Sequence, residues 1–186
     1  MDTVLFIRHA ETDLAGRFCG RSNPPVNERG LRQIEQLLNV IKNESIDSLY
    51  ASDLSRSLTT AEAIGRAFGL LPNVVPDLRE IDFGEWEGLS WKEIEARDRA
   101  YAQRWSEGYP NLPAPGGETF EAFQSRVLTQ LKLLVAWSAQ RCGAVVTHAG
   151  VMRVVLRSLC GLDEREAWER TSEYCGFFRY QAGRLA

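Results

Sequence analysis

The sequence has few of the features that mark membrane, secreted and nucleic-acid-binding proteins. No stretch approaches the roughly 20 consecutive apolar residues that a membrane-spanning helix needs. The 22 Lys and Arg residues do not exceed the 25 Asp and Glu residues. The resulting net charge of −3 argues against nucleic-acid binding, for which a basic excess is usual. The apolar run at residues 4–7 is too short for a signal peptide and follows no basic segment. We therefore expect a cytoplasmic protein that binds neither membranes nor nucleic acids.

Cysteine and histidine are also scarce. The four cysteines, at positions 19, 142, 160 and 175, form no C-x-x-C pair, which excludes a zinc knuckle and a thioredoxin-like motif. We expect free thiols in a reducing compartment. With two histidines and no cysteine cluster, we expect no metal site and no cofactor. The sequence also lacks a G-x-S-x-G elbow, a P-loop, an H-E-x-x-H pair and the cysteine phosphatase loop.

What remains is an ordinary globular composition. The 186 residues are 44% hydrophobic and 25% charged, close to the average for a folded domain. We find no repeat and no break in composition, so we expect a single domain over residues 1–186. The Pro- and Gly-rich segment 108–117 is expected to be a lid or binding loop of that domain.

Short apolar runs alternate with amphipathic segments along the chain. We expect strands at residues 4–7, 48–51, 143–147 and 177–180, with a short extended piece at 74–75. We expect helices after the caps Asn27, Ser52 or Asp53, Ser90 and Thr119, and over residues 151–159. The helix after Ser90 is expected to contain both Trp91 and Trp105. This alternation predicts an α/β fold, a three-layer sandwich with a mostly parallel central sheet flanked by helices.

The two histidines, His9 and His148, each directly follow a predicted strand. Because the carboxyl ends of neighbouring parallel strands meet at one edge of a sheet, we expect both histidines in one site. Arg8 precedes the first histidine, and Arg56 lies near the start of the helix after the second strand. Most histidines are ordinary polar residues and most helical arginines face solvent. The coincidence of all four residues predicts a pocket for a phosphate dianion, which guanidinium groups bind through two parallel hydrogen bonds.

In five motifs the sequence resembles the histidine phosphatase superfamily, also called the phosphoglycerate mutase-like family. They are Phe-Ile-Arg-His-Ala-Glu-Thr at 6–12, Ser-Asp-Leu-Ser-Arg-Ser at 52–57, Leu-Arg-Glu-Ile-Asp-Phe-Gly-Glu-Trp-Glu-Gly at 78–88, Pro-Gly-Gly-Glu at 115–118 and Val-Thr-His-Ala-Gly at 146–150. The motifs occur in the order typical of the family and cover nearly the whole chain. The resemblance implies a phosphoglycerate mutase-like fold.

The resemblance also implies the role of each matching residue. His9 would be the nucleophile that becomes phosphohistidine, and Glu80 would donate a proton to the leaving oxygen. Arg8, Arg56 and His148 would hold the phosphoryl group. No metal ion is implied. If Glu80 is not the acid, residues 82 and 85 in the same motif are the next candidates.

Further residues are weaker candidates. Gly20 and Arg21 of the first loop are candidates for binding phosphate or substrate, and Arg17 with Arg21 for binding a second anionic group, although a loop arginine is more often solvated. Trp86 and Trp91 line a substrate pocket or, more often for large aromatic residues, pack in the core. At position 15 an alanine stands where many members carry an asparagine that binds the phosphate.

We therefore expect a phosphomonoesterase that acts on a small phosphorylated metabolite through a phosphohistidine. The short chain and the Pro-Gly-Gly-Glu segment are most similar to the α-ribazole phosphatase and small broad-specificity phosphatase branch, so α-ribazole 5'-phosphate is one candidate substrate. Two alternatives stay open, a phosphoglycerate mutase-type phosphotransferase and a regulatory module that binds phosphorylated ligands with little turnover. A homodimer is compatible with the sequence.

Overall fold

A six-stranded sheet forms the centre of the computed structural model, which describes residues 3–137, 142–181 and 184–185. The strand order is β3-β2-β4-β1-β5-β6. The strands are β1 (Thr3–Arg8), β2 (Ser48–Ala51), β3 (Asn73–Val74), β4 (Cys142–Thr147), β5 (Phe177–Gln181) and β6 (Arg184–Leu185). The first four strands pair in parallel, and β5 and β6 are antiparallel. The predicted mostly parallel sheet is therefore confirmed.

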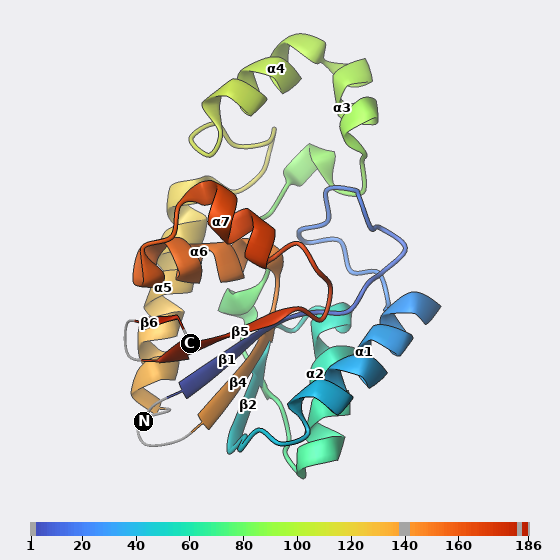
Figure 1. Cartoon of the computed structure of the whole chain (residues 1–186). Coiled ribbons are helices and arrows are strands. Elements are labelled where there is room, and N and C mark those ends of the chain that lie inside the picture. Colours follow the sequence, from blue (N-terminus) through green and yellow to red (C-terminus); the bar gives the residue numbers. More distant parts are fainter. Residues whose placement is uncertain (1–2, 138–141, 182–183, 186) are drawn as a thin grey trace.

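Helices cover both faces of this sheet, as Figure 1 shows. They are α1 (Glu28–Ile41), α2 (Ser55–Phe68), α3 (Trp91–Arg97), α4 (Arg99–Gly108), α5 (Phe120–Trp137), α6 (Ala149–Cys160) and α7 (Glu164–Arg170). The α1–α2 pair covers one face, and α5 and α6 cover the other. Helices α3 and α4 stand apart from the sheet, beyond the carboxyl ends of its parallel strands. The predicted three-layer sandwich is confirmed.

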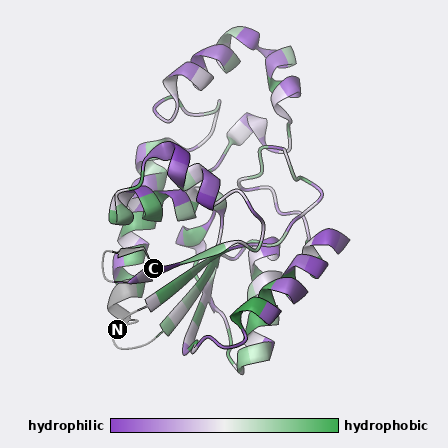
Figure 2. Ribbon diagram, viewed as in Figure 1, coloured by the Kyte–Doolittle hydropathy of each residue, from purple (hydrophilic) through white to green (hydrophobic). Residues whose placement is uncertain are grey.

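Alternating side chains of each central strand enter two separate cores. Val4 and Phe6 of β1 pack with α5 and α6, whereas Leu5 and Ile7 pack with α1 and α2. Both faces of the strand are therefore buried, which explains why the sequence of β1 is a continuous apolar run. Figure 2 shows the same feature, because the strands are largely hydrophobic while α7 is largely hydrophilic.

Three helix starts follow the predicted capping, and at one of them Ser90 Oγ accepts a hydrogen bond from Glu93 N–H to cap α3. The Asn27 side chain accepts a hydrogen bond from Gly30 N–H at the start of α1. Thr119 Oγ1 accepts one from Ala122 N–H at the start of α5.

No helix within the described ranges is long and apolar enough to cross a membrane.

Other predicted boundaries were wrong. Helix α2 begins after Leu54, which makes no side-chain cap, because Ser52 and Asp53 hydrogen-bond to other partners. The helix expected after Ser90 is two helices. Asp98 ends α3 and accepts a hydrogen bond from Tyr101 N–H at the start of α4, so the chain changes direction there. Helix α7 and strand β6 were not predicted.

Candidate active site

The two histidines meet at the carboxyl edge of the sheet. Strands β1 and β4 are parallel neighbours whose register pairs Arg8 with Thr147, so His9 and His148 leave the sheet side by side. Their ring centres are 5.0 Å apart, and both side chains are buried. The prediction that strand pairing brings the histidines into one site is confirmed.

The hydrogen bonds of His9 define its tautomer. Nδ1 lies 2.7 Å from the carbonyl oxygen of Ala10, which only accepts, so Nδ1 carries the ring proton. Nε2 keeps its lone pair and accepts a hydrogen bond from Arg56 Nε–H at 3.2 Å. Burial, with the positive charges of Arg56 and Arg8, holds the pKa of His9 well below its usual range. The ring is therefore neutral at pH 7, with its lone pair on Nε2.

Arg56 is fully buried at the start of α2 and is held by the first loop. Its Nη1 donates to the carbonyl oxygen of Ser22 at 2.7 Å, and Nη2 donates to the carbonyls of Gly20 and Cys19 at 2.9 and 3.3 Å. The loop therefore holds the guanidinium beside His9.

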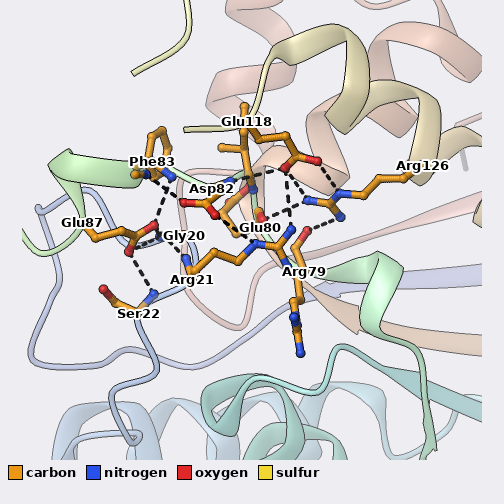
Figure 3. Close-up of polar contacts among 12 residues, drawn as sticks. Gly20, Arg21, Ser22, Arg79, Glu80, Asp82, Phe83, Glu87, Glu118 and Arg126 are labelled. Atoms are coloured by element: carbon orange, nitrogen blue, oxygen red, sulfur yellow. Dashed lines mark hydrogen bonds and ion pairs between the residues drawn. The ribbon is translucent and has the colours of Figure 1, made fainter. Parts of the chain in front are cut away.

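A carboxylate in turn holds this loop. Glu87 accepts hydrogen bonds from the backbone N–H groups of Gly20, Arg21, Ser22 and Phe83 at 2.8–3.1 Å (Figure 3). Such a cradle of amides is suited to an anion, and here an internal carboxylate occupies it. The N–H groups of Gly20 and Arg21 therefore bind Glu87 in this structure.

The side chains of this loop make contacts with neighbouring segments. The guanidinium of Arg21 lies 3.9 Å from carboxylate oxygens of both Asp82 and Glu118. A Cβ atom on Gly20 would overlap with the carbonyl oxygen of Ile81, so only glycine allows the loop to approach this closely.

Two buried nitrogens beside His9 have no hydrogen-bond partner within the described part of the chain. They are Arg8 Nε and His148 Nδ1. Arg8 Nη1 donates to the carbonyls of Thr171 and Ser172, and its Cζ lies 3.8 Å from the centre of the Tyr174 ring. An unpaired buried polar group costs about 1–3 kcal/mol, so both nitrogens favour a ligand with acceptor oxygens.

His148 is held by Ser52, whose Oγ lies 3.0 Å from Nε2. The Ser52 oxygen accepts from Leu54 N–H, and its hydroxyl hydrogen is free to be donated to Nε2. In that tautomer the ring proton of His148 is on Nδ1, the atom without a described partner. Burial, with the charge of Arg56, holds the pKa of His148 well below its usual range.

Glu80 lines a cavity and binds the segment that follows His148. Its Oε2 accepts a hydrogen bond from Gly150 N–H at 2.9 Å, and Oε1 accepts one from Ile81 N–H at 3.0 Å. A Cβ atom on Gly150 would overlap with Oε1. The glycine that follows His148-Ala149 therefore allows the carboxyl group to lie against the start of α6.

The cavity beside Glu80 has a volume of about 490 Å³, which is typical of a small-molecule site. Its aromatic lining residues are Phe18, Phe83, Trp105, Tyr109, Phe120, Phe123 and Trp168. Glu80 and Gly150 line it, whereas neither histidine does. Gly150 lies two residues after His148, so the cavity adjoins the segment that carries this histidine.

Trp86 and Trp91 do not line the cavity; they pack with Phe18 and Trp105 in an aromatic cluster under α3 and α4. The packing interpretation of these tryptophans is therefore the one that the structure supports. Within residues 3–137, 142–181 and 184–185, no three His, Cys, Asp or Glu side chains lie together in a way that could hold a metal ion.

Several residues of the site were not found from the sequence. Glu87 lies inside the motif at 78–88 but carries no local sign of its contact with the first loop. Three residues reach the site from distant segments without any pattern in the sequence that indicates it: Tyr174, Arg126 and Arg153. Ser52 directly follows β2, the parallel neighbour of β4, so the strand-end pattern that predicts the place of His148 also applies to it.

Comparison with known proteins gives a consistent result. The family model of the histidine phosphatase superfamily (branch 1) matches residues 4–183. The chain is 27% identical over 172 residues to an adenosylcobalamin/alpha-ribazole phosphatase of Salmonella typhimurium, covering 91% of this chain and 85% of that protein. It is 29% identical over 170 residues to phosphoserine phosphatase 1 of Hydrogenobacter thermophilus, covering 90% and 81%. The crystal structure of the alpha-ribazole phosphatase from Shigella flexneri has a similar fold, with a TM-score of 0.87, 23% identity and coverage of 99% and 93%.

Proposed function

The chain belongs to the histidine phosphatase superfamily, and from this membership we propose that it hydrolyses a phosphate monoester of a small metabolite through a phosphohistidine on His9. The observation that carries this proposal is the state of His9, a neutral ring whose Nε2 lone pair lies beside Arg56. In the first step Nε2 attacks phosphorus, the N–P bond forms, and the P–O ester bond breaks.

Three groups stabilise the charge on the transferred phosphoryl group. Arg8 Nε and His148 Nδ1 donate to its oxygens and thereby gain the partners that they lack in the structure. Arg56, whose Nε lies 3.2 Å from His9 Nε2, adds its positive charge beside the attacking atom. Positioning and fixed positive charge are the main requirements of phosphoryl transfer, so this scheme needs no metal ion.

Glu80 protonates the leaving oxygen in this scheme. The carboxyl group lines the cavity and binds Gly150 N–H, two residues after His148, so we place the leaving group on the cavity side of Glu80. After the alcohol departs, the Glu80 carboxylate accepts a proton from the water that attacks phosphohistidine. One group thus serves as acid in the first step and as base in the second.

The cavity favours a large, mostly apolar leaving group. α-Ribazole 5'-phosphate, whose leaving group carries an aromatic heterocycle on a ribose, is the candidate that the similar alpha-ribazole phosphatases suggest. The aromatic walls of the cavity support this candidate, because aromatic rings pack well against such a heterocycle.

The charges that line the cavity favour a hydrolase over a mutase that encloses a bisphosphate. The cationic lining residues are Arg153 and Arg157, and Arg157 pairs with Glu164 at 3.3 Å. No described carboxylate lies within 4.0 Å of the Arg153 guanidinium, so the cavity offers one unpaired cation to a second phosphate. We place the reaction in the cytoplasm, in agreement with four free cysteines.

The test of this function is to trap the intermediate. The protein is mixed with a ³²P-labelled phosphate monoester and quenched within one turnover. The label should be labile to acid and stable to base, as a phosphoramidate is, and His9→Ala should remove both label and hydrolysis. Cys19→Ser serves as the matched control and should keep both. Acid-stable label on serine or cysteine would overturn the proposal, and a wild-type protein without turnover would favour the regulatory module.

A further inference from the structure

Arg126 of α5 uses three of its five N–H donors to bind the segment that carries Glu80, and the other two to bind Glu118. Nη1 donates to the carbonyl oxygens of Asp77 and Arg79 at 2.8 and 2.9 Å. Nη2 donates to the carbonyl of Glu80 at 3.0 Å and to Glu118 at 2.8 Å, and Nε donates to Glu118 at 2.7 Å (Figure 3). The five donors of the guanidinium thus match five acceptors.

These contacts hold the backbone on both sides of Glu80. Three of the acceptors are carbonyls within the four residues 77–80, a segment with a short 3-10 turn at Pro76–Leu78. On the other side, Glu118 Oε2 accepts a hydrogen bond from Asp82 N–H at 3.3 Å. The Arg126–Glu118 pair therefore spans residues 77–82, with Glu80 between its two ends.

The Arg126–Glu118 pair is largely shielded from solvent. The side chain of Arg126 is 17% exposed and that of Glu118 is 14% exposed. The guanidinium also lies 4.8 Å from the ring centre of Phe123, which is fully buried on the same helix. A charge pair in this setting is weakly screened by water and salt.

The backbone and the carboxyl group of Glu80 thus have separate supports. The carboxyl oxygens are held by Gly150 N–H and Ile81 N–H, whereas the carbonyl of the same residue is held by Arg126. A proton donor must lie within hydrogen-bond reach of the leaving oxygen, so a shift of its backbone lowers the rate even if its charge is unchanged.

We propose that Arg126, together with Glu118, is a positioning residue for the proton donor Glu80. This inference rests on the proposed function. Arg126 touches neither the phosphate nor the nucleophile. The effect of replacing it should therefore depend on how strongly the departure of the leaving group requires protonation. Only the planar guanidinium satisfies three carbonyls and a carboxylate together. A lysine at this position keeps the charge but has one nitrogen and three donors.

The test compares the Arg126→Lys variant on an alkyl phosphate and on 4-nitrophenyl phosphate in single-turnover measurements. Alkoxides leave poorly without a proton, whereas nitrophenolate leaves readily. We expect phosphorylation of His9 to slow about 10–100-fold with the alkyl phosphate and by less than about threefold with the aryl phosphate. The matched control is Arg165→Lys on α7, where an exposed arginine pairs with Glu169, and it should leave both rates unchanged.

A double-mutant cycle then tests whether the rate loss of Arg126→Lys depends on the carboxyl group of Glu80. In a Glu80→Gln background, Arg126→Lys should no longer change the ratio of the two rates. Equal losses on both substrates, or the same selective loss in the absence of the Glu80 carboxyl group, would overturn this inference. If Arg126→Lys does not fold, Glu118→Gln weakens the same contact from the other side and is judged by the same two criteria. A wild-type protein without any phosphatase activity would refute the proposed function instead.

Discussion

Replacing Gly150 with alanine adds one carbon atom against the proposed proton donor. In the structure, that carbon would overlap with Glu80 Oε1 and lie close to the other atoms of the carboxyl group. The Glu80 side chain borders the cavity, so it has room to move away. The substitution therefore displaces the acid without changing its chemistry.

The size of the effect follows from this displacement. The carboxyl group has to move by about 1 Å before ordinary van der Waals contact is restored. A misplacement of about 1 Å in a catalytic group costs on the order of 10²-fold in rate. The same change favours helix α6, because alanine has a higher helix propensity than glycine by up to about 1 kcal/mol. The melting temperature should therefore stay constant or rise by about 2–4 °C.

The assay measures thermal unfolding and single-turnover phosphorylation of His9. For Gly150→Ala we expect unchanged or higher stability, a loss of about 10²-fold with an alkyl phosphate and a much smaller loss with 4-nitrophenyl phosphate. Gly108→Ala, where the added carbon would make ordinary contact with Leu112, is the matched control and should change neither rate. An alkyl phosphate rate within about twofold of wild type would refute the reasoning, because the predicted overlap would then have no effect on the acid.

Three further predictions concern other parts of the site. Burial lowers the pKa of His9 and His148, so below a pH of about 6.5 the unfolded chain binds protons that the folded protein does not. The free energy of unfolding should therefore fall as the pH falls from 7 to 5 in urea titrations, and a constant value across that range would contradict the assignment. Glu87→Gln should lower the free energy of unfolding by about 1–3 kcal/mol and slow alkyl and aryl phosphates equally, because it loosens the loop that holds Arg56; a selective loss would argue for a role near the acid. Incubation with EDTA should leave activity intact, and a loss that added divalent metal restores would refute the metal-free scheme.

Local sequence patterns were sufficient to predict the outline of the fold and the proximity of the two histidines. Each central strand is a short apolar run, because both of its faces are buried, and His9 and His148 stand where two such runs end. Neighbouring parallel strands end at the same edge of a sheet, so the residues that directly follow them lie close together in space. Asn27 and Thr119 mark helix starts in the same local way.

Tertiary structure decided the contacts that support the site. Tyr174 stacks on Arg8, Glu87 fills the amide cradle of the first loop, and Arg126 binds carbonyls of residues 77–80. Each contact joins segments that are 46 to 166 positions apart. Backbone carbonyls and amides are the same in every residue, so a sequence carries no sign of which of them a distant side chain binds. That choice depends on how helices, loops and sheet pack together.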